Sequence, residues 1–208
     1  MKMRATPVIK QHRSNAKLIG AFFIVAAVTS IVGLMQYNPI LANPKYLSEG
    51  YAHYNQVILG VVFELILVST MMGTSVMLYP YLKSYNESWG LGYVIFRLLE
   101  GIFIVIGLTA ILSLLKLSEF YVAKPQLISS NFELVGYILK SIHRWAFMLG
   151  PNFMLGINTF IYSAIFLKSG LIPRGLSILG ITGAVLIFIA ALLELFDVIE
   201  QLSIFGVI

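Results

Sequence analysis

The stretch Leu18–Leu34, LIGAFFIVAAVTSIVGL, decides the fold class of this chain. It holds no ionisable side chain, and its length is close to the roughly 20 apolar residues with which an α-helix crosses a bilayer. The residues after it, from Gln36 to Leu41, offer no small-x-small cleavage site, which favours an uncleaved signal anchor over a cleaved signal peptide. The first predicted span therefore covers residues 17–35.

The basic tail before this stretch, residues 1–16, indicates the direction of insertion. The first 17 residues contain no acid and five cations, namely Lys2, Arg4, Lys10, Arg13 and Lys17. Such a tail could bind nucleic acid, but an apolar span directly behind it favours a topogenic role. We therefore expect a cytoplasmic N-terminus and no nucleic-acid partner.

The composition of the whole chain agrees with a membrane protein. Of its 208 residues, 59% are hydrophobic and 11% are charged, whereas soluble domains have about 45–50% apolar and about 25% charged residues. There is no cysteine, which excludes disulfides, thiolate metal sites and a cysteine nucleophile. We expect an all-α, polytopic helical bundle that forms one domain over residues 1–208 and has the lipid bilayer as its main partner.

Four further apolar segments are long enough to span, and they cover residues 54–79, 90–115, 145–167 and 174–195. We expect the second span to stop at Pro80, with a short polar loop over 81–89 that makes spans two and three antiparallel neighbours. A longer polar connection is expected over 116–131. The segment 132–142 has helical spacing but is short, so it is either an interfacial helix or an extension of span four; six spans result if it inserts.

The distribution of lysine and arginine favours a multi-pass protein of the cell membrane with its N-terminus inside. The five cations of the first 17 residues, together with Lys83, Lys168 and Arg174, place eight cations on the cytoplasmic side. Five lie on the opposite side: Lys45, Lys116, Lys124, Lys140 and Arg144. Five spans then put the C-terminus outside, where residues 196–208 are expected to form a short amphipathic tail.

Ionisable residues inside the predicted spans form the main candidate site. Glu64 lies about ten residues into span two, and Glu100 lies about ten residues into span three. At 1.5 Å per residue, both fall roughly 15 Å deep. Arg97 shares a helix face with Glu100, so we expect a midplane cluster of all three, since a charge in the bilayer needs a partner or water. Asn158 and Tyr162 on span four, and Tyr93 on span three, are expected to border this cluster.

A second polar group is expected near the outer surface. Glu194 and Asp197 are three residues apart late in span five, and His143 and Arg144 lie at the outer end of span four. The topology puts these four on one side of the membrane. The histidines have no metal-ligand spacing, and standard nucleotide and hydrolase motifs do not occur, so we expect no metal, no cofactor and no catalytic residues of these types.

Five stretches carry a resemblance that extends from about residue 16 to 200. They are Asn55–Gly60 with Glu64 and Leu65, Leu78–Pro80 with Lys83, Gly92 and Tyr93 with Arg97 and Glu100, Trp145–Phe147 with Gly150 and Pro151, and Leu171–Arg174 with Leu176 and Ser177. Together they resemble a bacterial and archaeal family of small multi-pass membrane proteins catalogued as domain of unknown function 4386. The resemblance implies a helical membrane fold and a prokaryotic source, and it implies no activity.

Three functions remain open from the residues alone. The leading hypothesis is a polar intramembrane pocket that binds or passes a small solute, ion or lipid group, with Arg97 as the anion-binding group and Glu64 or Glu100 as the proton-accepting carboxylate. The alternatives are a structural or accessory membrane subunit and, less favoured, a membrane-embedded enzyme with a pair of glutamates as general acid and base.

Overall fold

A computed structural model describes residues 7–124 and 130–198 of the chain, with the side chains of residues 15–124 and 131–198. Within this part there is no strand, and the long helices are α1 (Pro7–Met35), α4 (Tyr54–Tyr85), α5 (Glu87–Ala123), α6 (Ser130–Phe147), α7 (Leu155–Ser169) and α8 (Arg174–Leu195). Between α1 and α4 lie the short helices α2 (Asn38–Leu41) and α3 (Tyr46–Glu49) and the 3₁₀ turn η1 (Gly50–His53). The π-helical segment η3 (Met148–Met154) joins α6 to α7.

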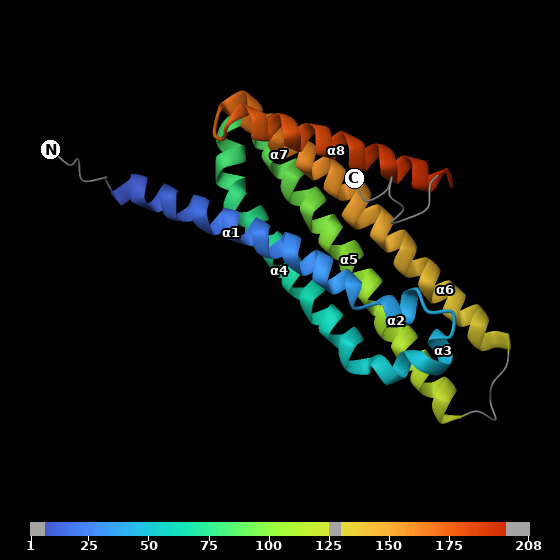
Figure 1. The fold of residues 1–208 in the computed structure, drawn as a ribbon. Helices are drawn as coiled ribbons and strands as arrows, with labels where there is room; N and C mark the ends of the chain where they lie inside the picture. The colour runs from blue at the N-terminus through green and yellow to red at the C-terminus, as the bar shows by residue number, and fades with distance from the viewer. Residues whose placement is uncertain (1–6, 125–129, 199–208) are drawn as a thin grey trace.

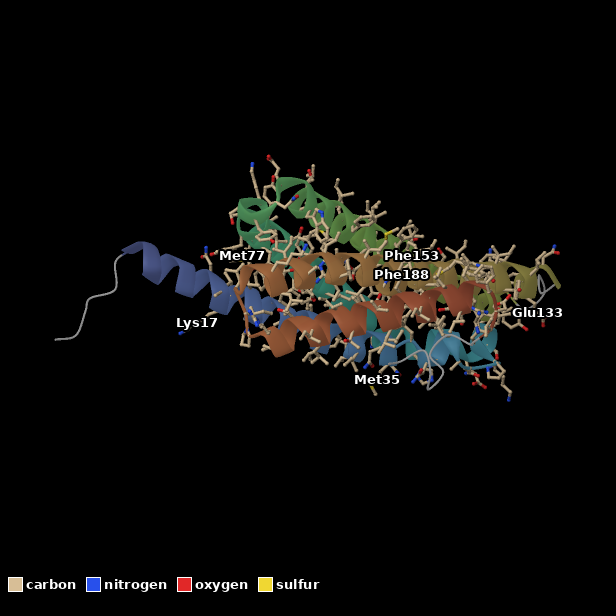
Figure 2. All side chains as sticks on the ribbon, turned by 90° about the horizontal axis from the view of Figure 1, so that it is seen from above. Lys17, Met35, Met77, Glu133, Phe153 and Phe188 are labelled. Atoms are coloured by element: carbon tan, nitrogen blue, oxygen red, sulfur yellow. The ribbon has the colours of Figure 1, made fainter. Side chains whose placement is uncertain are left out.

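Helix α5 lies at the centre of the bundle. It packs against α4 on one side and against α6, η3 and α7 on the other, while α1 packs on α4 and α8 packs on η3 and α7. Figure 1 shows the α4–α5 and α7–α8 turns at one end of the bundle, with α2 and α3 beside the far end of α5. At the η3–α8 contact, Phe153 and Phe188 lie side by side, with ring centroids 4.8 Å apart (Figure 2).

In the part of the chain that the structure describes, four helical segments are long and apolar enough to cross a membrane. They are Asn15–Leu41, Tyr46–Tyr85, Glu87–Ala123 and Arg174–Leu195. The fifth predicted span, residues 145–167, is helical throughout but is divided by η3, so neither α6 nor α7 alone has the same length and hydropathy. The chain is an all-α helical membrane protein.

The second predicted span does not stop at Pro80, and the prediction of a loop over 81–89 was wrong. Helix α4 continues through Pro80 to Tyr85, and α5 begins at Glu87. Proline removes one backbone donor, a loss that membrane helices tolerate when neighbouring groups compensate. The chain reverses at Asn86, whose extended backbone ends α4 and whose Oδ1 accepts a hydrogen bond from the Trp89 amide at 3.0 Å.

The predicted connection over 116–131 is also shorter than expected. Helix α5 runs to Ala123, and α6 begins at Ser130, so residues 116–123, which include Lys116, Ser118 and Glu119, are helical. The segment 132–142 belongs to α6 and continues through η3 into α7, which makes it an extension of the fourth span. Of the predicted C-terminal tail, residues 199–208 lie outside the described residues.

Two glycines allow the close helix contacts that position the site. A Cβ on Gly60 of α4 would lie 3.0 Å from the Gly33 carbonyl oxygen of α1. A Cβ on Gly150 of η3 would lie 2.7 Å from the Phe103 Cβ and 3.2 Å from the Glu100 carbonyl oxygen of α5. Small residues let membrane helices approach closely, and the second contact brings η3 directly against the backbone of Glu100.

Candidate functional site

Arg97 and Glu100 form a buried ion pair on one face of α5. Each residue is 4% exposed, and Arg97 Nη1 lies 2.9 Å from Glu100 Oε2. The Asn158 Nδ2 of α7 donates a hydrogen bond to the same carboxylate oxygen, and Asn158 is fully buried. Three predicted site residues are thus brought together, and their hydrogen bonds join the central helix to α7.

Glu64 does not complete a triad with this pair. Among the described residues, no ion pair or hydrogen bond joins Glu64 to Arg97, whose carboxylate partner is Glu100. The prediction of equal depth was wrong because both helices extend beyond the predicted spans and reverse at Asn86. Glu64 precedes that residue by 22 positions and Glu100 follows it by 14, which offsets them by about 12 Å along the helix axis.

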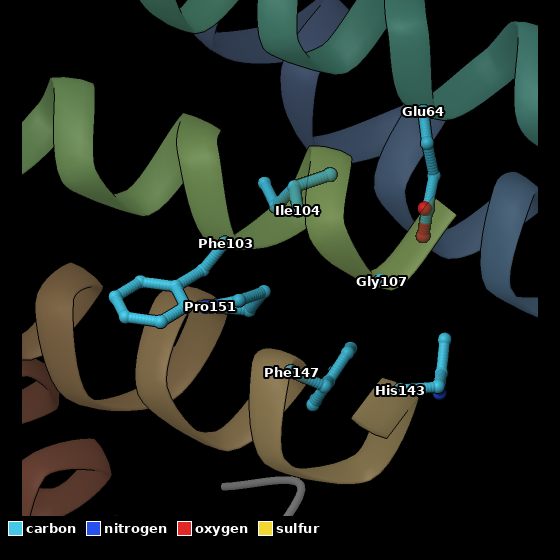
Figure 3. A pocket seen from close by; sticks show the side chains of 7 residues that line it. All are labelled: Glu64, Phe103, Ile104, Gly107, His143, Phe147 and Pro151. Atoms are coloured by element: carbon cyan, nitrogen blue, oxygen red, sulfur yellow. The ribbon is translucent and has the colours of Figure 1, made fainter. Parts of the chain in front are cut away.

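The Glu64 side chain instead faces the middle of α5 and the beginning of the fourth span. Figure 3 shows its carboxylate pointing from α4 toward Gly107, with His143 of α6 across a small cavity. That cavity measures about 10 Å³, which is roughly the room needed by one water molecule. The hydroxyl of Tyr37, which follows α1, is buried beside Glu64 and interacts with its carboxylate.

A larger cavity of about 440 Å³ connects the two groups of charges. Glu64, Arg97 and Glu100 all line it, together with the polar side chains of Ser30, Asn152 and Tyr162. The other lining residues are apolar and come from α1, α4, α5, α6, η3, α7 and α8: Phe23, Ala26, Ala27, Ile31, Leu34, Leu67, Met71, Ile104, Phe147, Pro151, Leu155 and Ile187. The site is therefore an apolar chamber with three ionisable groups in its wall.

The rim of this cavity is formed in part by exposed residues of α1. Ala27 is exposed, and Ile31, one turn later, is 64% exposed. Both lie in the middle of the membrane-spanning segment Asn15–Leu41. The lining residues of α1 recur at helical spacing, so one face of this helix forms the wall from Phe23 to Leu34.

The two predicted tyrosines pack together at one end of the cavity. Tyr93 is fully buried, and its ring meets that of Tyr162 edge-on, with centroids 5.8 Å apart. Tyr162 also contacts the Phe23 ring of α1 at 5.9 Å. Tyr162 therefore lines the cavity, whereas Tyr93 does not line it and packs against the Tyr162 ring.

Three of the four residues predicted for the outer polar group come together. Arg144 lies 3.7 Å from a carboxylate oxygen of Glu194 and 3.7 Å from one of Asp197. Asn152 donates a 3.4 Å hydrogen bond to Glu194, which is 2% exposed. His143 points elsewhere, because successive helical residues are rotated by about 100°.

His143 lies on the inner side of the bundle instead. It is 7% exposed, and its ring meets Tyr37 edge-on with centroids 6.2 Å apart. Placing it in the outer group was wrong. It belongs with Glu64 and Tyr37.

Sequence reasoning missed the contribution of the first helix to the site. The spacing of Ala26, Ser30 and Leu34, four residues apart, could have indicated a helix face that leaves room beside it. It also missed Phe147 and Asn152, because their positions depend on the π-helical turn around Pro151, and no local pattern marks such a turn.

The comparisons with known proteins give one match. The family model described as Domain of unknown function (DUF4386) matches residues 18–208. No curated protein and no solved structure matches the chain. Because that match covers nearly the whole chain, including every helix that lines the cavity, the protein belongs to the family described as Domain of unknown function (DUF4386).

Proposed function

We propose that this protein binds a small solute, ion or lipid group in its intramembrane cavity. The observation that supports the proposal is the cavity of about 440 Å³ with Glu64, Arg97 and Glu100 in its wall. A charged side chain at the centre of a bilayer costs about 2.5–3.5 kcal/mol on insertion scales. Ionisable residues that line a cavity in a membrane bundle therefore favour a binding role.

The three charges have different roles in this proposal. The Arg97 and Glu100 charges offset each other, and Asn158 supplies a further donor. Glu64 is 8% exposed and has no arginine or lysine within ion-pair distance among the described residues. Of the two carboxylates first considered, Glu64 is therefore the proton-accepting or ligand-binding one, and Arg97 serves as counter-ion to Glu100.

The position of the rim indicates how a ligand enters. Ala27 and Ile31 are exposed in the middle of a membrane-spanning segment, where the surrounding solvent is lipid acyl chain rather than water. A ligand that enters past them comes from within the bilayer. This favours a molecule that partitions into lipid over a strongly hydrated solute.

A structural or accessory role is the second candidate, and one observation favours it. The Arg97–Glu100–Asn158 network is buried and links α5 to α7, which is the arrangement of a contact that fixes helix packing. The enzyme hypothesis has less support, because Glu64 and Glu100 are offset by about 12 Å along the helices and so cannot act as a hydrogen-bonded pair.

A rim variant tests the binding function. Ala27→Trp places a large side chain at the exposed rim, whereas Val28→Trp, at the next position, changes an exposed residue that does not line the cavity. Both variants and the wild type are purified in lipid nanodiscs, and the bound small molecules are extracted and identified by mass spectrometry. We expect one molecule to be retained by the wild type and Val28→Trp and lost from Ala27→Trp. The same molecules in all three samples, or none in the wild type, refute the proposal.

We also propose that the protein lies in the cell membrane with its N-terminus in the cytoplasm, on the basis of the lysine and arginine distribution. The chain has no cysteine, so single cysteines can be introduced at Lys45 and Glu87, which lie at opposite ends of α4 and are both exposed. A membrane-impermeant maleimide added to whole cells should label position 45 only. Labelling of position 87 alone reverses the orientation.

A further inference from the structure

We infer that the ligand of this cavity is an organic monocation with an apolar tail, held by the Glu64 carboxylate. The inference rests on the proposed binding function and adds the chemical class of the ligand. It depends on the balance of charge in the cavity wall, on the composition of that wall, and on the groups that surround Glu64.

The balance of charge favours a cation. Of the described residues that line the cavity, three are acidic or basic, and two of these, Arg97 and Glu100, form an ion pair with each other. With all three ionised, the wall carries one net negative charge, which is that of Glu64. A ligand that brings one positive charge makes the cavity neutral, whereas an anion adds a second uncompensated charge in a region of low dielectric constant.

The composition of the wall favours a molecule that is mostly apolar. Twelve of the lining residues among the described part of the chain are apolar, and they come from every long helix of the bundle. Phe147 lines both the large cavity and the small cavity next to Glu64. Aromatic rings attract organic cations through their faces, so a cationic head at Glu64 has an aromatic neighbour, and an alkyl tail has apolar surface up to Tyr162.

The other groups that face Glu64 do not replace such a ligand. Tyr37 lies beside it and His143 lies across the small cavity. A tyrosine brings no positive charge. His143 is surrounded by Tyr37 and Phe147 and is 7% exposed, an environment that disfavours a charged imidazole unless a counter-ion is in contact with it. Among the described residues near Glu64, His143 is thus the side chain that could compete with the ligand, and the experiment includes that outcome.

Three probes with the same tail and different heads test the inference. Octyltrimethylammonium carries a positive charge, octanesulfonate carries a negative charge, and 1-octanol is neutral. Binding to the full chain in nanodiscs of zwitterionic lipid is measured by equilibrium dialysis, with empty nanodiscs subtracted. We expect the wild type to bind the cation at least about tenfold more tightly than either other probe.

Matched variants separate the charge of Glu64 from the cavity itself. Glu64→Gln keeps the shape and should lower cation affinity about tenfold, to that of 1-octanol. Glu133→Gln removes one exposed carboxylate of α6, far from the lining residues, and should leave all three affinities unchanged. Ala27→Trp should abolish the binding of all three probes. If Glu64→Gln does not fold, the ratio of cation to anion affinity in the wild type still decides the question.

The measurements distinguish failure of the cation assignment from failure of the binding function. Equal affinity for the three probes, or a preference for the anion, overturns the assignment of a cation but leaves the binding function intact as long as Ala27→Trp blocks 1-octanol. Equal affinities that become cation-selective in His143→Gln show that His143 neutralises Glu64, which also overturns the assignment. If no probe binds more than it binds to empty nanodiscs, or if Ala27→Trp leaves all three affinities unchanged, the binding function is refuted, and the inference is refuted with it.

Discussion

Removing the charge of Glu100 should destabilise the bundle far more than removing a matched charge on the surface. Glu100→Gln keeps the shape of the side chain but leaves the Arg97 guanidinium, 4% exposed, without a carboxylate. Breaking a buried pair by removing one partner costs about 3–5 kcal/mol. Because glutamine can still accept the hydrogen bond from Asn158, we expect the free energy of unfolding to fall by about 3 kcal/mol, at the lower end of that range.

The same helix supplies the control. Lys116 and Glu119 are also three residues apart on α5, and Lys116 Nζ lies 2.7 Å from Glu119 Oε2. Their side chains, however, are 71% and 35% exposed. Glu119→Gln should therefore cost no more than about 1 kcal/mol. The two pairs share the spacing and the carboxylate that is removed, and they differ in burial and in the cation, which is arginine in the buried pair and lysine in the exposed one.

A double variant tests the cause of the loss. Arg97→Met together with Glu100→Gln removes both charges and keeps an acceptor for Asn158, so it should recover most of the lost stability and lie within about 1–2 kcal/mol of the wild type. Reversible unfolding in mixed micelles, followed by circular dichroism as denaturing detergent is added, measures all four proteins. The reasoning is refuted if Glu100→Gln costs no more than Glu119→Gln, or if the double variant is as unstable as the single one.

Three further predictions concern the helix contacts around the site. Gly60→Ala should lower the free energy of unfolding by about 1–3 kcal/mol, because the new Cβ would lie 2.7 Å from the Tyr37 ring. Gly20→Ala on α1 is the control: its Cβ would meet nothing within 4 Å, so the variant should be tolerated. Arg144→Gln should lower the free energy of unfolding by about 1–3 kcal/mol, because it leaves the buried Glu194 carboxylate without its cation. Asp197→Asn removes a charge from a side chain that is 80% exposed, so it should change that free energy by no more than about 1 kcal/mol. Equal losses in the two variants would contradict the burial argument. Asn86→Ala should cost about 1 kcal/mol through loss of the cap at the start of α5, and an unchanged unfolding curve would show that the hydrogen bond to the Trp89 amide contributes nothing.

The fold class was predictable from the sequence because it depends on composition and length. Apolar segments of about 20 residues can satisfy their backbone groups in lipid only as helices or closed barrels, and α8, residues 174–195, begins and ends where the pattern placed it. Helix ends beyond the hydrocarbon region follow other rules. Residues 116–123, with Lys116, Ser118 and Glu119, continue α5, because hydropathy indicates where the lipid ends and not where a helix ends. Pro80 lies inside α4, because a membrane helix tolerates the loss of one backbone donor.

The candidate site was predictable only where it depended on one helix face. Arg97 and Glu100 pair because they are three residues apart on α5. The position of Glu64 depends on where α4 and α5 reverse, and an error of a few residues in that turn moves the carboxylate by several ångströms. The grouping of His143 with Arg144 failed for a similar reason, because depth in the membrane says nothing about the direction in which neighbouring side chains point.

An experimental density map of the full chain in lipid nanodiscs tests the central claim most directly. The claim predicts non-protein density that fills the cavity between α1, α4 and η3, passes the rim at Ala27 and Ile31, and ends within about 4 Å of the Glu64 carboxylate, the distance of an ion pair. A bundle in which side chains close that cavity, with Glu64 in an ion pair with a cationic side chain of the protein itself, would contradict it.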